Sequence, residues 1–304
     1  MKLSQGRHAL AIPGPSVMPD EVLAAMHRPA PNIYEGPLVT MTATIMDDLR
    51  WVAQTSHHVA VYISNGHGAW EAALANTVPR GGRILVLANG RFAHGWAEMA
   101  RGLGLNVEML DFGEVSAPDP LQVEETLRAD KAHEIKAVLA CHVDTSTGVL
   151  ADPVALRAAL DAAGHPALLM MDCIASLAVD RFEMDAWGVD VTVSGSQKGL
   201  MTPPGLGIVW FGPRAVEAHA GAEPSAYWDW APRMAPEFYY QNFGGTAPTH
   251  HLYGLRQALD MLKEEGLDAI WARHEVLAQA YWAAIEAWGT DGPMRLNVAD
   301  PGQR

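Results

Sequence analysis

The pattern of hydrophobic positions alternates between two kinds of segment over most of the chain. Short apolar runs, rich in residues that favour strands and with little alternation, predict strands that are covered on both faces. They lie at 59–64, 83–88, 106–110, 135–142, 167–172, 189–194 and 206–212. Amphipathic stretches with helical spacing lie between them, at 68–78, 95–104, 121–130 and 153–164. This alternation predicts an α/β fold whose central sheet is mostly parallel and flanked by helices.

The pattern changes after residue 213. Residues 222–251 are rich in aromatic residues, Pro and Gly, and predict a long irregular loop, which in a compact protein usually has a function. On a monomer this loop would expose six aromatic side chains, Tyr227, Trp228, Trp230, Phe238, Tyr239 and Tyr240. Exposed patches of that kind usually mark an interface. Two helical stretches follow, at 251–266 and 266–289, and residues 296–304 begin with apolar positions that have no predicted partner.

Composition and charge exclude several classes of function. A chain of 304 residues forms one large domain, or a large and a small one. The net charge of −14 and the scattered Lys and Arg exclude a basic face for nucleic acid. Cys141 and Cys173 lie in apolar runs and predict reduced core thiols. No apolar run is long enough for a bilayer and the N-terminus has no signal-peptide core, so we expect a cytoplasmic protein without a membrane partner.

Residues with chemical functions follow several of the predicted strands. In an open α/β sheet, ligands bind at the carboxyl ends of the strands. There the chain places SNGHG after 59–64, NGRF after 83–88, VDTSTG after 135–142, Asp172 at the end of 167–172, and GSQK after 189–194. One site would thus combine helix N-terminal amides, an aromatic ring, hydroxyls, an acid and the amine of Lys198. These are the groups that pyridoxal 5′-phosphate requires, since an amine binds its aldehyde and an acid pairs with its pyridine nitrogen.

Each feature also has a plainer interpretation. The Gly-rich turn can serve tight packing, Asp144 or Thr145 can cap a turn, and Phe92 can pack in the core. A buried Asp172 can cap a helix. Taken together, these interpretations leave a non-catalytic nucleotide-binding α/β protein as an alternative, and such a protein would stay colourless with pyridoxal phosphate. No metal site is predicted, because three histidines lack the spacing of metal ligands: His67, His94 and His142.

The chain resembles the class V aminotransferases of pyridoxal phosphate fold type I, specifically the alanine/serine–glyoxylate aminotransferase family. The segments that carry the resemblance fall in order along nearly the whole chain. They are PGPS (13–16), SNGHGAWEAAL (64–74), ANGRF (88–92), STGVL (146–150), MDCIASL (171–177), SGSQKGLMTPPGLG (194–207) and GGTAP…LYGLRQAL (244–259). The SGSQK…PPG element, with an Asp at a strand end upstream, is the most specific of them.

The resemblance implies two catalytic residues and a set of cofactor contacts. Lys198 is the Schiff-base lysine and Asp172 the partner of the pyridinium nitrogen. Phe92 stacks on the ring, Thr145 meets the ring oxygen and Gln197 meets the phosphate. The remaining expected contacts are with the phosphate and the cofactor's edge, and they come from Asn65, Gly66 and His67.

The resemblance also implies a homodimer with shared active sites, because Thr246 aligns with a threonine that reaches the phosphate of the neighbouring subunit. Two positions depart from the family pattern. Asn65 stands where a small hydroxyl residue is common, and Phe243 stands about where some members carry a phosphate-binding tyrosine.

The implied reaction is the transfer of an amino group from a small amino acid, such as serine, alanine or aspartate, to a 2-oxo acid, glyoxylate or pyruvate. A pyridoxamine–pyruvate aminotransferase and a lyase or desulfurase of the same fold are the alternatives. Desulfurases of this class carry a His just before the lysine and a catalytic Cys late in the chain. Here Gln197 precedes the lysine and no Cys follows Cys173, which disfavours a desulfurase.

The resemblance predicts three parts of the chain. An N-terminal arm (1–20) precedes the large cofactor-binding domain (21–262), and residues 263–304 begin a small C-terminal α/β domain. In the family that small domain supplies the arginine for the substrate carboxylate. We expect the sequence to be truncated before this arginine, so the residue is not assigned.

Overall fold

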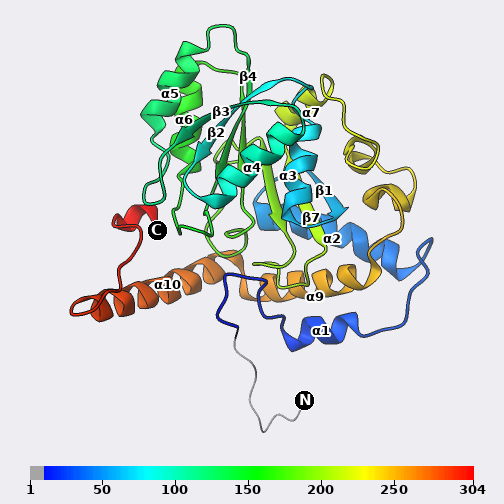
Figure 1. The fold of residues 1–304 in the computed structure, drawn as a ribbon. Helices are drawn as coiled ribbons and strands as arrows, with labels where there is room; N and C mark the ends of the chain where they lie inside the picture. Colours follow the sequence, from blue (N-terminus) through cyan, green and yellow to red (C-terminus); the bar gives the residue numbers. More distant parts are fainter. Residues whose placement is uncertain (1–9) are drawn as a thin grey trace.

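The computed structural model describes residues 10–304, which form a seven-stranded sheet between layers of helices (Figure 1). The strands are β1 (His58–Ile63), β2 (Arg83–Ala88), β3 (Asn106–Asp111), β4 (Ile135–Cys141), β5 (Leu168–Asp172), β6 (Val191–Gly195) and β7 (Leu206–Phe211). Their order is β1-β7-β6-β5-β4-β2-β3, and β7 runs antiparallel to both of its neighbours while the other pairs are parallel. The predicted mostly parallel sheet is confirmed, with strand ends that differ by one or two residues.

Six of the helices also agree with the predicted amphipathic stretches. The helices are α1 (Asp20–Met26), α2 (Pro37–Ala53), α3 (Gly66–Ala75), α4 (Arg91–Gly102), α5 (Pro120–Ala129), α6 (Pro153–Ala163), α7 (Pro213–His219), α8 (Ala231–Met234), α9 (Thr249–Glu265) and α10 (Leu267–Gly289). The six that agree are α3, α4, α5, α6, α9 and α10. The described residues also form two 3₁₀ turns, η2 (Tyr239–Phe243) and η3 (Pro301–Gln303). The hydrophobic pattern did not predict α1, α2, α7 or α8, of which all but α2 are too short to show a helical period.

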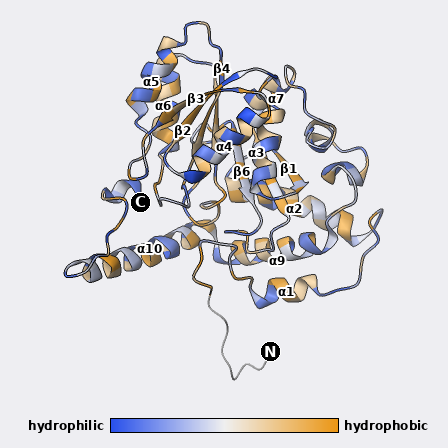
Figure 2. Ribbon diagram, viewed as in Figure 1, coloured by the Kyte–Doolittle hydropathy of each residue, from blue (hydrophilic) through white to orange (hydrophobic). Residues whose placement is uncertain are grey.

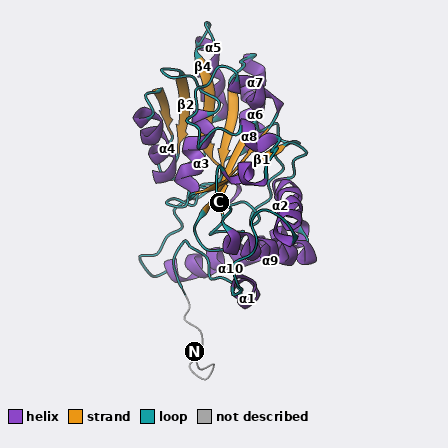
Figure 3. Ribbon diagram, turned by 90° about the vertical axis from the view of Figure 1, so that its right-hand side faces the viewer, coloured by secondary structure: helices purple, strands orange, loops and turns teal. Residues whose placement is uncertain are grey.

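Alternate residues of each strand contact two separate hydrophobic cores. In β1, Val59 and Val61 belong to the core under α2, α5, α6 and α9, whereas Ala60 and Tyr62 belong to the core under α3, α4 and α7. Both faces of the sheet are therefore covered, which explains why the strands are almost uniformly apolar while the outer helices are mixed (Figures 2 and 3). Between residues 10 and 304, no helix combines the length and the apolar character needed to cross a bilayer.

The loop at 222–251 is less exposed than its composition suggests. Trp230 is completely buried, and its ring stacks on Phe211 of β7 with the ring centroids 3.9 Å apart. Trp228 and Tyr239 are half-buried. The expectation of six exposed aromatic rings was therefore wrong for these three, because β7, β1 and α2 offer the loop apolar surfaces of its own chain. The aromatic side chains of this loop that stay exposed are those of Tyr227, Phe238 and Tyr240.

Residues 296–304 also find partners, contrary to the expectation from sequence. After α10 extends away from the sheet, the chain turns back (Figure 1) and the backbone N–H of Leu150 donates to the Gln303 carbonyl at 2.9 Å. The Asn297 amide donates to the Thr147 carbonyl at 3.0 Å, and Val298 is buried. The division of the chain at residue 262 stays a prediction. The first nine residues of the predicted N-terminal arm lie outside the described part of the chain.

Candidate active site

A cavity of about 280 Å³ lies where the strands β1, β2, β4, β5 and β6 end. Its lining brings together eight predicted site residues from five separate segments of the chain: Asn65, Gly66, His67, Phe92, Thr145, Asp172, Gln197 and Lys198. Thr246 does not line this cavity, and its side chain is exposed. The strand ends thus indicated the segments that line the cavity, and the family resemblance indicated the individual residues, while Thr246 lies elsewhere on the subunit.

Asp172 ends β5 at the base of the cavity, and its side chain is buried. Its Oδ1 accepts a hydrogen bond from the backbone N–H of Ile174 at 2.7 Å. Its Oδ2 accepts one from Nε1 of Trp70 at 2.9 Å, and the Cys141 thiol lies 3.9 Å from the same oxygen. Burial raises the pKa of the Asp172 carboxyl to about 7, although the bonds from Ile174 and Trp70 favour the ionised form. A cation placed against this carboxylate would relieve the cost of its burial.

Lys198 reaches the same cavity from the loop after β6, and its amine donates a hydrogen bond to the Pro13 carbonyl. The segment at 13–16 is fastened to this loop, because the Ser16 hydroxyl donates to the Lys198 carbonyl at 2.9 Å and the Ser16 N–H donates to the Gln197 carbonyl at 2.8 Å. Burial lowers the pKa of the Lys198 amine, and the charge of Asp172 opposes that shift. The amine is therefore easier to deprotonate than an exposed lysine.

The N-terminus of α3 forms another wall of the cavity. Asn65 is its N-cap, and the side-chain Oδ1 accepts hydrogen bonds from the backbone N–H groups of His67 at 3.0 Å and Gly68 at 3.4 Å. A β-carbon at Gly66 would overlap the end of the Ile174 side chain, so this glycine lets α3 pack closely against the loop after β5 without moving Ile174. The positive end of the helix dipole faces the cavity and therefore favours the binding of an anion there.

Trp70 lines the cavity too, and sequence reasoning did not single it out. Its ring stacks on Trp96 at a centroid distance of 5.8 Å and meets Phe92 edge-on at 6.4 Å. Trp70 follows SNGHG by two residues, one helical turn inside α3. Because Trp70 lies one helical turn after the first residues of this helix, it lies on the same side of the helix as they do. The helical spacing within SNGHGAW could therefore have placed Trp70 beside the cavity.

The residues of the cavity fit pyridoxal 5′-phosphate. Besides the amine and the carboxylate, the side-chain Oε1 of Gln197 is buried without a hydrogen-bond partner in the described structure. Native proteins seldom leave such a group unpaired unless a ligand or water completes it. The cavity offers a partner for each chemical group of this cofactor. The helix N-terminus suits its phosphate, the buried carboxylate suits its ring nitrogen, and the amine suits its aldehyde.

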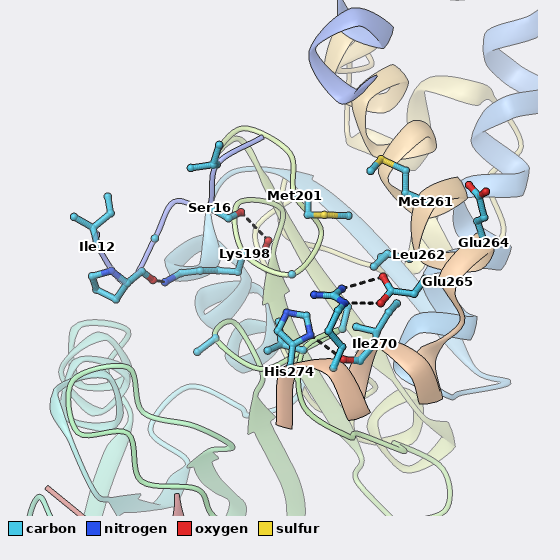
Figure 4. Close-up of a pocket in the computed structure, with 18 residues that line it drawn as sticks. Ile12, Ser16, Lys198, Met201, Met261, Leu262, Glu264, Glu265, Ile270 and His274 are labelled. Atoms are coloured by element: carbon cyan, nitrogen blue, oxygen red, sulfur yellow. Dashed lines mark hydrogen bonds and ion pairs between the residues drawn. The ribbon is translucent and has the colours of Figure 1, made fainter. Parts of the chain in front are cut away.

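A second cavity, of about 760 Å³, also has Lys198 in its lining (Figure 4). It shares Gly14, Ala175 and Lys198 with the first cavity. Its far wall comes from the end of α9 and the start of α10, where Nε and Nη2 of Arg273 lie 2.5 and 2.9 Å from the Glu265 carboxylate oxygens. Lys198 therefore lines both the first cavity, called the inner cavity below, and the second, called the outer cavity.

Within residues 10–304 no group of three or more His, Cys, Asp or Glu side chains is arranged to hold a metal ion. His67 packs against Trp70, and His94 lies 3.5 Å from Asp111. His142 is buried, its Nδ1 lies 2.9 Å from the Ser176 hydroxyl, and burial lowers its pKa to about 4. The two cysteines, Cys141 and Cys173, are free and buried, as expected.

Comparison with curated proteins gives close relatives over most of the chain. A family model described as Aminotransferase class-V matches residues 14–293. The chain is 40% identical to the serine–glyoxylate aminotransferase of Methylorubrum extorquens over 293 residues, which cover 93% of this chain and 72% of that protein. It is 39% identical to the L-aspartate–glyoxylate aminotransferase of Paracoccus denitrificans over 287 residues, with the same coverage of 93% and 72%.

Solved structures agree with this relationship. The pyridoxamine–pyruvate aminotransferase of Mesorhizobium loti superposes with a TM-score of 0.84 at 26% identity, covering 95% of this chain and 73% of that one. The sheet and its helices are thus the fold of known fold type I aminotransferases. The chain belongs to the class V aminotransferases, a family of pyridoxal phosphate-dependent transaminases.

Proposed function

We propose that this transaminase moves the amino group of a small amino acid to glyoxylate or pyruvate, with Lys198 as the cofactor-binding and proton-transferring residue. The observation that carries the proposal is the shared cavity of Lys198 and Asp172. The names of the relatives support the substrate class: serine and aspartate are the amino donors, and glyoxylate is the acceptor.

The cofactor contacts follow from the walls of the inner cavity. The helix α3 N-terminus at Asn65, Gly66 and His67 would hold the phosphate together with Gln197, whose side-chain NH₂ group would donate to a phosphate oxygen. Because Asn65 Oδ1 already accepts from the N–H groups of His67 and Gly68, its own side-chain NH₂ group would be turned toward the phosphate. Phe92 would cover the face of the cofactor ring, and Thr145 would contact the hydroxyl oxygen of that ring.

When bound, the cofactor supplies an electrophilic aldehyde and an electron-withdrawing ring that acidifies the Cα–H of an attached amino acid. Asp172 would hold the proton on the ring nitrogen by staying ionised beside it. Lys198 Nζ would take the proton from the substrate Cα, because burial lowers the pKa of the amine toward the pH at which it can act as a base.

The outer cavity is the route that we assign to the substrate. It adjoins Lys198 and is lined mainly by apolar side chains, among them Val17, Met201 and Ile270. In this state the charge of Arg273 is paired with Glu265. A small amino acid would therefore reach Lys198 between these apolar walls.

We also propose a homodimer whose partner completes each site. Thr246 is exposed and lies outside the inner cavity, so a role at a phosphate would be met in the neighbouring subunit. Tyr227, Phe238 and Tyr240 remain exposed in the same loop, and a two-fold interface is the commonest way to cover such a patch. Two free, buried cysteines accord with a reducing compartment, and we place the enzyme in the cytoplasm.

A panel of half-reactions tests the proposed substrates. The protein loaded with pyridoxal phosphate is mixed separately with serine, alanine, aspartate and pyridoxamine, and the visible absorbance band of the cofactor is followed. Loss of the band with at least one of the three amino acids, restored by glyoxylate or pyruvate, supports the proposal. A band that responds to pyridoxamine alone would contradict it.

A further inference from the structure

Asp144 lies in the loop after β4 with its side chain completely buried. Its carboxylate accepts hydrogen bonds from two directions. Oδ2 accepts from the backbone N–H groups of Phe92 at 2.9 Å and Ala93 at 3.1 Å. Oδ1 accepts from the backbone N–H of Ser146 at 3.0 Å and from its hydroxyl at 2.6 Å. Within residues 10–304 it forms no ion pair, so these donors are what compensates for burying the charge.

The first pair of bonds gives α4 a cap that comes from far along the chain. The residue at the N-cap position, Gly90, has no side chain to supply one. A β-carbon at Gly90 would overlap the Asp144 carboxyl group. Glycine at this position therefore leaves room for Asp144, 52 residues after Phe92, to cap the helix. The dipole of a 12-residue helix adds to the attraction for this carboxylate.

The second pair of bonds ties the same carboxylate to the loop of Thr145. Two further bonds join the loops after β2 and β4: the Arg91 N–H donates to Ser146 Oγ at 2.8 Å, and the Thr147 hydroxyl donates to the Asn89 carbonyl at 3.0 Å. Asp144 is the centre of this junction because it alone binds both loops through one buried charged group.

We propose that Asp144 is a positioning residue that fixes the spacing between Phe92 and Thr145, and with it the width of the slot for the cofactor ring. The two side chains line the inner cavity, and each lies within one residue of an Asp144 contact. The inference rests on the proposed roles of Phe92 and Thr145 in cofactor binding. An ordinary turn cap would need only one of the two oxygens.

The Asp144→Asn variant tests this, because an amide can accept hydrogen bonds at one of the two positions but not at both. Cofactor-free protein is titrated with pyridoxal phosphate, and the dissociation constant and the visible circular dichroism per bound cofactor are measured. We expect binding about tenfold weaker, from the loss of charge-assisted bonds. We also expect a smaller dichroism signal, because the ring would be held less firmly.

Two control variants separate positioning from loss of stability. Asp152→Asn alters the N-cap of α6, where Oδ1 accepts from Val154 and Ala155 at 2.9 and 3.1 Å, outside the cavity lining. Asp190→Asn alters a buried carboxylate at the opposite end of the sheet, which binds Arg214 and the Leu169 N–H. Asp190→Asn should lower the midpoint of thermal unfolding, whereas Asp152→Asn should change it little because the amide oxygen keeps both bonds. Both variants should leave the dissociation constant unchanged.

The proposal is overturned if Asp144→Asn binds the cofactor as the unaltered protein does, or if Asp190→Asn weakens binding equally. Should Asp144→Asn not fold, Ser146→Ala removes a single hydroxyl from the junction and is expected to weaken binding about threefold; unchanged binding there also overturns the proposal. Half-reactions of the unaltered protein are run in parallel. Failure of those reactions would refute the proposed function, independently of the variant affinities.

Discussion

Nε1 of Trp70 donates a 2.9 Å hydrogen bond to Oδ2 of Asp172, joining α3 to the end of β5 beneath the inner cavity. The Trp70 ring is held in turn by Trp96, which stacks on it at an interplanar angle of 14°. A fixed N–H dipole on a buried carboxylate favours its ionised form, against a burial that raises the pKa of Asp172 to about 7. Trp70 therefore helps to keep Asp172 able to pair with a ring nitrogen.

Trp70→Phe should shift the pH dependence of cofactor binding. Removing the indole N–H favours the neutral acid, so the pKa of Asp172 rises further and the carboxylate exists only at higher pH. The pH at which affinity for pyridoxal phosphate is half its maximum should move up by about one unit, which corresponds to about 1.4 kcal/mol. The shift is measured by titrating the cofactor-free protein with pyridoxal phosphate at several pH values between about 6 and 9, a range that spans the pKa of Asp172.

Trp96→Phe is the matched control, because the Nε1 atom of Trp96 is buried without a hydrogen-bond partner in the described structure. It removes an indole from the same stack without touching Asp172. Identical pH profiles for Trp70→Phe and Trp96→Phe would show that the bond to Asp172 has no part in cofactor binding.

Asp172→Asn should stabilise the cofactor-free protein at alkaline pH. The pKa of Asp172 is raised from 3.8 to about 7 on folding, so the native state holds a proton that the unfolded state releases between these values. Stability of the unaltered protein therefore falls as pH rises from about 4 to 7, by up to about 4 kcal/mol. The amide has no such loss. Urea unfolding at pH 4 and pH 8 should show the gain at pH 8 alone; an equal difference at both would contradict the raised pKa.

Gln197→Met should weaken binding of pyridoxal phosphate and leave binding of pyridoxal unchanged. A methionine of similar size fills the site but cannot donate to the phosphate, so the loss should be about tenfold. Gln197→Glu, which adds a negative charge, should weaken binding more. Both ligands are titrated against the same cofactor-free preparations. Equal losses for pyridoxal and its phosphate would place Gln197 at the ring instead.

Mixed subunits test the shared site. Lys198→Ala and Thr246→Glu should each be inactive alone, the second because its charge would repel a phosphate in the partner. After subunit exchange, half of the dimers are mixed and each has one intact site, so activity of about a quarter of that of the unaltered protein should appear. A mixture no more active than its two components would count against shared sites.

The candidate site could be predicted from sequence to the extent that its residues directly follow strands. Asp172 and Lys198 come at or just after the ends of β5 and β6, and parallel strands bring such positions to one edge of the sheet. Trp70 and Asp144 were not assigned these roles, because their bonds join positions 102 and 52 residues apart that no local pattern relates. A hydrophobic pattern indicates which positions are buried, but it does not indicate which distant loop a buried polar side chain will bond.

The long loop at 222–251 shows a second limit. Its composition predicted exposed aromatic rings, yet Trp230 stacks on Phe211, whose own burial in β7 the pattern had predicted. Aromatic content alone does not distinguish a ring that covers its own sheet from one that faces a partner. Phe238 and Tyr240, stacked on one another at 5.9 Å, are the exposed pair.

The lysine to which pyridoxal phosphate becomes attached tests the central assignment most directly. The loaded protein is reduced with borohydride, digested, and the labelled peptide is sequenced. The label should lie on Lys198 and should be absent from the Lys198→Ala variant. The sequence contains four other lysines as internal controls, at Lys2, Lys131, Lys136 and Lys263. A label on any of these in the unaltered protein would contradict the assignment of Lys198 and of the cavity around it.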